Sequence, residues 1–404
     1  MWRRASAADE RGIQQVRGNG EDHRRVFYGA KTAVCLLFAL LCAGVDAAEE
    51  QVTFYRTYGY LQDRDWVIPM RLWVHEAPSP AQRGLAKVAR TILAKRAGIA
   101  DLSEKQEKIF LQHADDFFAD SESRESVRFS FDHDTEQQAF FLQNSDGETT
   151  TDLNGLLEGA LRLDRETASR LLEAQGSSQG WLRFRAVSKD HEGIGFVRLI
   201  PPEGLSVISD IDDTIKLTEI PAGEPTVLMN TFFSDFVAVP CMAEMYRGFG
   251  DEVAFHYVSG GPWQMYRPLD DFLFADAIGF PPGSFHMKSL RTNVFEKGTY
   301  EDVWSIIANG SQQATFDQKL SQIGAIMNHF PGRSFILIGD SGEKDPEVFG
   351  QIREDFPEQV REIVIRAVTD EAAAGSARFD NMILIPSNEN KAEACGEFAN
   401  AVAH

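Results

Sequence analysis

The first half of the chain shows a hydrophobic pattern with a period of two. Between about residues 50 and 200, five segments alternate apolar and polar residues, as half-buried antiparallel strands do. The segments are QVTFYRTYGY, WVIPMRLWVHE, SVRFSFDHD, AFFLQN and GWLRFRAVS. Residues 81–116, between the second and third segments, instead space their apolar residues by about 3.6, which indicates helix. The pattern predicts an all-β, sandwich-like domain with a helical insertion.

From Leu205 onward the apolar runs become short and nearly continuous. They read LSVISD, VAFHYVSG, SFILIGD, REIVIRAV and NMILIPS, and they are rich in Val and Ile. Helical patterns at residues 262–277 and about 317–330 separate some of these runs, and a further helix is expected after Pro386. Continuous runs alternating with helices are typical of a parallel sheet covered on both faces. This half is therefore expected to be α/β, with a doubly wound and mostly parallel sheet.

The N-terminus has the pattern of a secretory signal. Basic residues up to Lys31 precede the apolar run TAVCLLFALLCAG, and small residues follow up to Ala47. The run is shorter than the about 20 residues that span a membrane, although an uncleaved anchor or a buried helix remains an alternative. The 404 residues then divide into a signal peptide (1–47), a β domain (48–203) and an α/β domain (204–404). We expect a periplasmic or secreted protein without a transmembrane helix in the mature chain, membrane-anchored if the signal is retained.

Composition narrows the possible partners. The formal net charge is −21, while the hydrophobic share of 43% and the charged share of 25% are ordinary for a globular protein. A strongly acidic surface repels polyanions, so a nucleic-acid partner is disfavoured. It also disfavours electrostatic docking on anionic lipid, which requires clustered Lys and Arg.

Cysteine and histidine positions offer no metal motif of their own. After the signal only Cys241 and Cys395 remain, with no CxxC pair or Cys/His cluster, so the sequence does not predict a zinc site. These two cysteines are expected to be free and buried, with a disulfide in an oxidising compartment as the alternative. The histidines of the first half, including His191, are scattered and are expected to be structural or solvated.

Polar residues gather where three of the predicted parallel strands end. Asp210 and Asp212 follow the first strand, Ser259 follows the second, and Asp340 with Asp345 follows a later one. Ligands of open parallel sheets bind beyond the carboxyl ends of the strands. Crowded carboxylates do not all stay ionised without a cation, and an all-oxygen group of ligands suits Mg²⁺. The strand ends therefore predict a magnesium site.

An anion site is expected beside these carboxylates. The stretch Ser259-Gly260-Gly261 offers a hydroxyl and backbone N–H groups, and Pro262 is expected to be the first residue of the following helix. Lys319 at the start of a later helix can reach the same edge as a point charge, with Lys288 as a rival. Carboxylates, metal, anion site and lysine together indicate phosphoryl transfer through a carboxylate nucleophile.

Other interpretations of the same motifs fit less well. The DIDDT stretch alone is compatible with a solvated turn or a calcium loop, but a calcium loop requires Gly at the position of Ile215. GDSG at residues 339–342 matches the surroundings of the nucleophilic serine of chymotrypsin-like proteases. Here Glu343 follows instead of Gly-Pro, and the preceding run predicts a buried parallel strand, so Ser341 is not expected to be a nucleophile.

Three motifs resemble a known family. VISDIDDTIK, HYVSGGPW and FPGRSFILIGDSGEKDPEVF are similar to motifs of the haloacid dehalogenase-like superfamily, and more narrowly of the phosphatidate phosphatase family typified by the yeast actin-patch protein. The resemblance covers roughly residues 200–390. It implies Mg²⁺-dependent hydrolysis of phosphatidic acid, at a membrane surface, to diacylglycerol and phosphate through an aspartyl-phosphate. That family also carries an all-β domain ahead of the catalytic one.

The resemblance assigns a role to each catalytic residue. Asp210 would be the nucleophile, and Asp212 would protonate the leaving oxygen and then activate water. Ser259 would bind phosphoryl oxygens, Lys319 would neutralise Asp210 and the phosphate, and Thr214 would orient the loop.

The resemblance also implies a set of metal ligands. Mg²⁺ would be held by Asp210, the backbone carbonyl of Asp212 and Asp340, with Asp345 nearer the outer coordination shell. The chain departs from the family at Cys241, where a glycine is expected before Met.

Two other functions stay open from the sequence. The same chemistry suits a soluble phosphomonoester or a phosphoprotein. A non-catalytic binding module is also conceivable, although five intact site residues argue against it: Asp210, Asp212, Ser259, Lys319 and Asp340.

Overall fold

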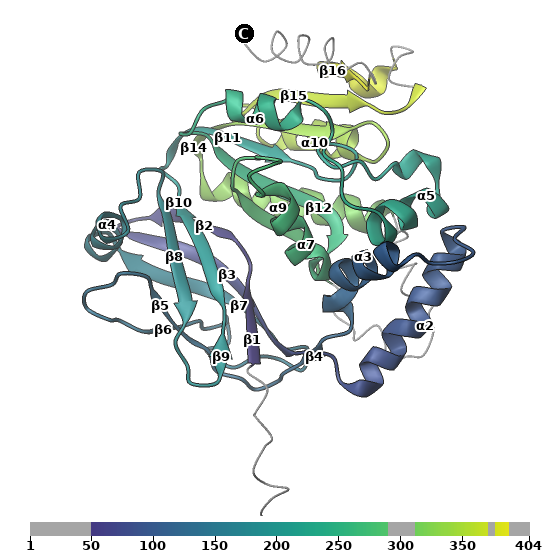
Figure 1. Cartoon of the computed structure of the whole chain (residues 1–404). Helices are drawn as coiled ribbons and strands as arrows, with labels where there is room; N and C mark the ends of the chain where they lie inside the picture. The colour runs from purple at the N-terminus through teal and green to yellow at the C-terminus, as the bar shows by residue number, and fades with distance from the viewer. Residues whose placement is uncertain (1–49, 290–311, 371–375, 388–404) are drawn as a thin grey trace, which may run out of the picture. The chain divides into compact units, whose positions relative to one another are not determined.

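The computed structural model describes residues 50–289, 312–370 and 376–387, all of which fall within the unit Glu49–His404 (Figure 1). The predicted signal peptide and the helix predicted after Pro386 lie outside the described residues. Among the described residues, no helix is both long and apolar enough to cross a bilayer. The two predicted domains are not separated within the described unit, so the boundary near residue 203 stays a prediction.

The first half forms a ten-stranded mixed sheet. Its strands are β1 (Glu50–Phe54), β2 (Thr57–Gln62), β3 (Asp65–Glu76), β4 (Asp120–Ser121), β5 (Arg128–Phe131), β6 (Phe140–Phe141), β7 (Leu156–Asp164), β8 (Trp181–Ala186), β9 (His191–Glu192) and β10 (Ile194–Leu199). Most neighbours are antiparallel, whereas β1 with β9 and β2 with β10 pair parallel. The alternating segments are confirmed as strands, and the sequence prediction missed β7, β10 and the two-residue strands β4 and β9. Helix α4 (Arg165–Ala174) follows β7 directly.

The helical insertion is confirmed as α2 (Pro80–Arg96) and α3 (Glu104–Ala114). Each begins with a capping box, in which a serine and a glutamine three residues later satisfy each other's backbone N–H groups. Their apolar faces join the hydrophobic core on one face of the second sheet rather than the core of the first sheet. Phe110 of α3, for example, stacks on Phe233 at 5.6 Å.

The second half forms a six-stranded, fully parallel sheet. Its strands are β11 (Glu203–Ser209), β12 (Ala254–Pro262), β13 (Ser284–Lys288), β14 (Gly332–Asp340), β15 (Val360–Ala367) and β16 (Ile383–Pro386), in the order β13-β12-β11-β14-β15-β16. Five were predicted, and β13 was missed. From the central strand β11 the chain adds β12 and β13 on one side. It then crosses to the other side of β11 and adds β14, β15 and β16 there. The carboxyl ends of β11 and β14 therefore border the crevice where ligands of such sheets bind.

Helices cover both faces of this sheet, as expected (Figure 1). Helices α9 (Gln312–His329) and α10 (Asp345–Asp355) bury apolar residues on one face. The other face is covered by α5 (Glu224–Leu228), α6 (Met242–Gly248), α7 (Tyr266–Leu273) and the two inserted helices. The α/β class with a parallel sheet covered on both sides is confirmed.

Two local predictions were wrong. Pro262 does not begin a helix: it ends β12 in extended conformation, a short 3-10 helix follows, and α7 begins only at Tyr266. Cys241 is not a free thiol but is disulfide-bonded. Its φ of 69° lies in the left-handed region that favours glycine, which explains why glycine is expected there from the family pattern.

Candidate active site

The structure brings the predicted strand-end residues together. Strands β12, β11 and β14 are neighbours, so Ser259, Asp210 and Asp340 emerge at the same edge of the parallel sheet. The backbone N–H of Asp210 still donates to Ile338 of β14, at 2.9 Å. The position of Asp210 is therefore set by the sheet ladder itself.

The loop after β11 is held by an aspartate for which the sequence predicted no role. Asp213 has a φ of 54°, a conformation that aspartate tolerates better than most residues. Its carboxylate accepts backbone N–H groups from Thr218, Glu219 and Ile220 at 2.6–2.9 Å. These bonds fold residues 213–220 into a tight turn beside the strand ends.

Lys319 of α9 is the central cation of the site. Its Nζ lies 2.8 Å from Asp210 Oδ1, 2.6 Å from Asp345 Oδ1 and 3.4 Å from a Glu343 oxygen, with 3% of the side chain exposed. Burial lowers the pKa of the ammonium, but the three carboxylates outweigh burial and raise the pKa well above its usual value. Lys319, rather than its rival Lys288, makes the contact with Asp210.

Asp210 is buried and hydrogen-bonded on both oxygens. Thr214 Oγ1 donates to Oδ2 at 3.0 Å, while Lys319 binds Oδ1. Burial raises the pKa of Asp210 well above its usual range; Lys319 opposes this, whereas the neighbouring carboxylates reinforce it. Thr214 therefore fixes the orientation of the Asp210 carboxylate directly.

An acidic cluster beside Lys319 can hold a cation. Asp210, Asp340 and Glu343 each offer an oxygen within 4.8 Å of the others. Asp340 Oδ1 accepts the Gly342 N–H at 2.6 Å, while Oδ2 is buried without a hydrogen-bond partner among the described residues. Burial, Asp345 and Glu343 raise the pKa of Asp340 well above its usual range. An unpaired buried oxygen within an all-oxygen group fits a hard divalent cation.

The members of this cluster differ from the predicted ligands. Glu343 was missed, although it stands in the same GDSGEKD motif. Asp345 lies outside the cluster: Lys319 binds one of its oxygens, and the other accepts the Asp340 N–H at 3.2 Å. The side chain of Asp212 is also outside it. The proposed role of the Asp212 backbone carbonyl stays a prediction.

Asp212 is instead paired with a buried lysine. Lys216 Nζ lies 2.8 Å from Asp212 Oδ1, and Thr218 Oγ1 donates to the same oxygen at 2.6 Å. Burial would raise the pKa of Asp212, but Lys216, Thr218 and Lys319 outweigh it and lower the pKa below its usual value. Lys216 is 2% exposed and lies 5.1 Å from the centre of the Phe236 ring. The sequence offered only its spacing of four residues from Asp212 as a signal.

Ser259 faces the same place as Asp212. Its Oγ donates a long hydrogen bond of 3.4 Å to Asp212 Oδ2 and accepts the Gly261 N–H at 2.9 Å. The expected α-helix does not begin at Pro262: a 3-10 helix, Trp263–Met265, stands between Pro262 and α7. What remains available for an anion is the Ser259 hydroxyl together with the surrounding lysines.

A cavity of about 170 Å³ opens between these elements. Its polar lining includes Asp212, Ser259 and Glu343, and its apolar lining includes five residues from the neighbouring elements: Ile220, Val227, Met265, Leu269 and Phe316. Four lysines also line it: Lys216, Lys288, Lys319 and Lys344. Four cations around one cavity favour an anionic ligand, although the chain as a whole is acidic.

Ser341 has a structural role. Its side-chain oxygen accepts the N–H groups of Val368 and Thr369 at 2.9 and 3.1 Å, and the residue is 2% exposed. The serine thus ties the loop after β14 to the segment after β15. These contacts leave the GDSG stretch without the histidine-activated serine of a protease.

The segment that builds this site matches a known family model. Residues 205–367 match the family described as "Phosphatidate phosphatase APP1, catalytic domain". This segment belongs to that family. The match includes every residue of the candidate active site, from Asp210 to Asp345.

Two curated relatives align with less than half of the chain. "Phosphatidate phosphatase APP1" of Saccharomyces cerevisiae is 33% identical over 176 residues, which are 42% of this chain and 27% of that protein. An uncharacterized protein of Schizosaccharomyces pombe is 26% identical over 43% of this chain and 26% of its own length. The alignments thus span about a quarter of each relative. The family relationship therefore concerns the catalytic segment.

Comparison with solved structures adds nothing to the family relationship. A type IV self-sufficient cytochrome P450 monooxygenase aligns with 79% of this chain and 28% of its own, at 11% identity and a TM-score of 0.16. A family two carbohydrate esterase from Cellvibrio japonicus aligns with 87% of this chain and 95% of its own, at 9% identity and a TM-score of 0.21. These scores carry no information on fold or activity.

Proposed function

We propose that this protein is a phosphatase of the haloacid dehalogenase-like type that hydrolyses phosphatidic acid to diacylglycerol and phosphate. The observation that carries the proposal is the contact of Lys319 with Asp210 beside the Asp340–Glu343 cluster, within the segment 205–367. A carboxylate, a buried lysine and a cation site around one anion cavity suit phosphoryl transfer. The mixed sheet ahead of the catalytic segment agrees with the expected N-terminal β domain.

In the first step, a carboxylate oxygen of Asp210 attacks phosphorus and the bond from phosphorus to the glycerol oxygen breaks. Asp212 donates a proton to that leaving oxygen. Its lowered pKa keeps Asp212 ionised in the free protein at neutral pH. A phosphate dianion bound beside Ser259 would raise this pKa, because a nearby negative charge favours the protonated acid.

In the second step, water attacks the phosphorus of the aspartyl-phosphate, and the bond to the Asp210 oxygen breaks. Asp212 accepts the proton from that water, and phosphate leaves. Throughout both steps Thr214 and Lys319 hold the Asp210 carboxylate in one orientation, which favours in-line attack. Lys319 also balances negative charge on the phosphoryl oxygens.

A divalent cation fits the cluster of Asp210, Asp340 and Glu343, and Mg²⁺ is the ion that we propose for it. When bound, it would neutralise charge on the transferring phosphoryl group. Asp345 would then act through Lys319 and the loop after β14 rather than as a direct ligand.

The cavity supports a phospholipid head group as the substrate portion that enters. A volume of about 170 Å³ accommodates a phosphate with its glycerol carbons but not two acyl chains. The apolar wall from Ile220 to Phe316 would contact the first carbons of the lipid, and the chains would remain in the membrane. A soluble phosphomonoester is the second candidate, because nothing in the polar half of the cavity distinguishes it from a lipid phosphate.

One assay tests the function. The full chain and Asp210→Asn are incubated with phosphatidate in mixed micelles and with soluble phosphomonoesters, with and without Mg²⁺. We expect Mg²⁺-dependent release from phosphatidate and its loss in Asp210→Asn, while Ser341→Ala, a variant of the structural serine, remains active. Release from soluble esters alone would favour the second candidate, and no release from any substrate would refute the phosphatase proposal.

We also propose export through cleavage of the predicted signal peptide. N-terminal sequencing of the secreted or periplasmic protein should then begin near Ala48. A mature chain that retains Phe27 would contradict cleavage.

A further inference from the structure

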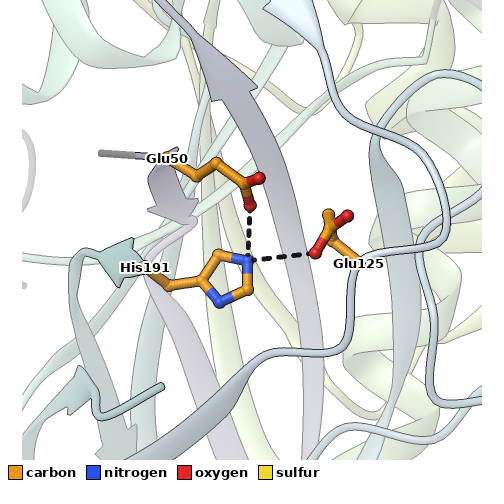
Figure 2. A group of neighbouring side chains, drawn as sticks. All are labelled: Glu50, Glu125 and His191. Carbon is orange, nitrogen blue, oxygen red and sulfur yellow. Dashed lines mark ion pairs between the residues drawn. The ribbon is translucent and has the colours of Figure 1, made fainter. Parts of the chain in front are cut away.

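A second group of metal-ligating side chains lies in the first sheet, outside the candidate active site. Figure 2 shows its three members, Glu50 of β1, His191 of β9 and Glu125 from the segment between β4 and β5. Each offers one ligand atom within 4.8 Å of the other two. Side chains from three distant parts of the sequence therefore converge on one point.

The backbone holds these residues in place. Glu50 is the direct partner of His191 in the parallel pairing of β1 with β9, and its N–H donates to the carbonyl of Asp190 at 3.0 Å. Glu125 and Thr151 share two hydrogen bonds of 3.0 Å. The Glu125 N–H donates to the Thr151 hydroxyl, and the Thr151 N–H donates to the Glu125 carbonyl. The convergence thus follows from the chain fold and does not depend on attraction between the side chains.

The imidazole of His191 is buried and faces two carboxylates. The His191 side chain is 5% exposed, and its Nε2 is directed at both carboxylates, 2.8 Å from Glu50 Oε2 and 3.7 Å from Glu125 Oε2 (Figure 2). Nε2 and Glu50 Oε2 meet only each other at hydrogen-bonding distance, and Nδ1 of the same ring is buried without a hydrogen-bond partner among the described residues. Buried polar atoms are rarely left in this state without a reason.

The spacing of these atoms suits a metal ion. Ligand atoms at about 2.1 Å from a tetrahedral zinc ion lie about 3.4 Å from one another. His191 Nε2 lies 2.8 Å from Glu50 Oε2 and 3.7 Å from Glu125 Oε2, one distance below that value and one above it.

The surroundings have an excess of negative charge. Burial raises the pKa of Glu50, and the Glu125 carboxylate raises it further. Burial likewise raises the pKa of Glu122, and Glu76 adds to the effect. Asp120 adds to the field around Glu122. A divalent cation between Glu50, Glu125 and His191 would balance this charge.

We propose that Glu50, Glu125 and His191 form a structural site for a divalent transition metal ion such as Zn²⁺. An imidazole nitrogen is a ligand for zinc and its neighbours in the first transition row, whereas Mg²⁺ and Ca²⁺ take oxygen ligands. The site therefore differs in chemistry from the all-oxygen cluster of the active site. A bound ion would tie the start of β1 to β9 and to the segment that carries Glu125.

Zinc binding to the full chain tests this directly. The protein is stripped with a chelator, supplied with Mg²⁺ for the active site and titrated with Zn²⁺ in a calorimeter. X-ray absorption at the zinc edge then reports the ligands. We expect one zinc ion with imidazole scattering and a rise in Tm of about 5 °C at zinc 100-fold above Kd. Zinc bound through oxygen alone, or no zinc bound, would overturn the proposal.

Matched variants localise the effect. His191→Gln and Glu125→Gln should lose the imidazole signature or weaken zinc binding at least tenfold. Glu192→Gln, at the exposed neighbour of His191, and His133→Gln, at an exposed histidine, should bind zinc as the unmodified chain does. Glu125 is only partly buried, so its variant remains informative even if His191→Gln does not fold. Unchanged zinc binding in both variants would show that the three side chains form only an ion pair.

Discussion

Lys319 Nζ lies 2.8 Å from Asp210 Oδ1, a contact that joins residues 109 positions apart. The same ammonium binds Asp345, so it is shared between the proposed nucleophile and the loop after β14. Helix α9 therefore carries the cation that makes two buried carboxylates compatible with the folded state.

Replacing Lys319 by Met should lower both activity and stability. The variant leaves Asp210 and Asp345 buried without their cation, which costs about 3–5 kcal/mol of the free energy of unfolding. Activity should fall by about 10²–10³-fold, as when a charge-stabilising donor is removed from an active site. Denaturant unfolding and kcat measure the two effects. Lys87→Met, at an exposed lysine of α2 that does not line the cavity, is the control and should change both by much less.

Mg²⁺ should stabilise the protein more at pH 7 than at pH 5. Asp210 and Asp340 have raised pKa values in the folded state, so the folded protein binds protons there more tightly than the unfolded chain does. Their contribution to the stability of the metal-free protein therefore falls as pH rises through the folded-state pKa. Mg²⁺ competes with those protons, and its stabilising effect should grow with pH. Tm measured with Mg²⁺ and with a chelator checks this, and a larger Mg²⁺ effect at pH 5 would contradict it.

Lys216 should set the protonation of Asp212 and act as a positioning residue. Because Lys216 lowers the pKa of Asp212, Lys216→Met should raise that pKa. If Asp212 must be protonated to act as the acid, the descending limb of the pH profile of kcat/KM moves to higher pH. Lys216→Arg should retain most of the original profile. A loss of activity in Lys216→Met with an unshifted profile would indicate a structural role only.

The periodicity of the sequence predicted much of the fold. Alternating segments became strands of the mixed sheet, and continuous runs became β11, β12, β14, β15 and β16. Strand β7 was missed although it pairs along much of β3, because its polar residues obscure the alternation. Strand β13 was missed because three of its five residues, SFHMK, are polar, and their burial depends on contacts that the sequence does not show, such as the hydrogen bond between Ser284 and His256.

The sequence predicted correctly those site residues whose positions follow directly from the end of a strand. Asp210 directly follows β11, Ser259 lies near the end of β12, and Asp340 is the last residue of β14. These strands are parallel neighbours, so the three residues meet at one edge of the sheet. Glu343 and Lys216 were missed because their orientations depend on turns after the strands. The structural metal group was missed for a related reason: Glu50, Glu125 and His191 are too far apart in sequence to form a motif.

Glu343→Gln should weaken binding of the active-site metal. The substitution removes one of the three carboxylates of the cluster while it keeps the size of the side chain. We expect the Mg²⁺ concentration for half-maximal activity to rise by about 10–100-fold, comparable to the loss of a supporting metal contact, with most of kcat recovered at saturating Mg²⁺. Glu354→Gln, at an exposed glutamate in α10, is the control. Equal Mg²⁺ dependence in both variants would exclude Glu343 from the metal site.

Gly339→Ala should disrupt the site through packing alone. A Cβ at Gly339 would lie 2.4 Å from Asp345 Oδ2, so the carboxylate that binds Lys319 would have to move. We expect a loss of about 1–3 kcal/mol in the free energy of unfolding, as for overpacking of a buried site, and a marked fall in kcat. Gly350 of α10 is the matched control, because a Cβ there would meet only Met382, at 3.8 Å. Gly350→Ala should stabilise the helix by about 0.5–1 kcal/mol without loss of activity, since alanine favours helix over glycine. Denaturant unfolding of both variants separates the two cases, and similar behaviour of the pair would mean that the close approach at Gly339 is not required.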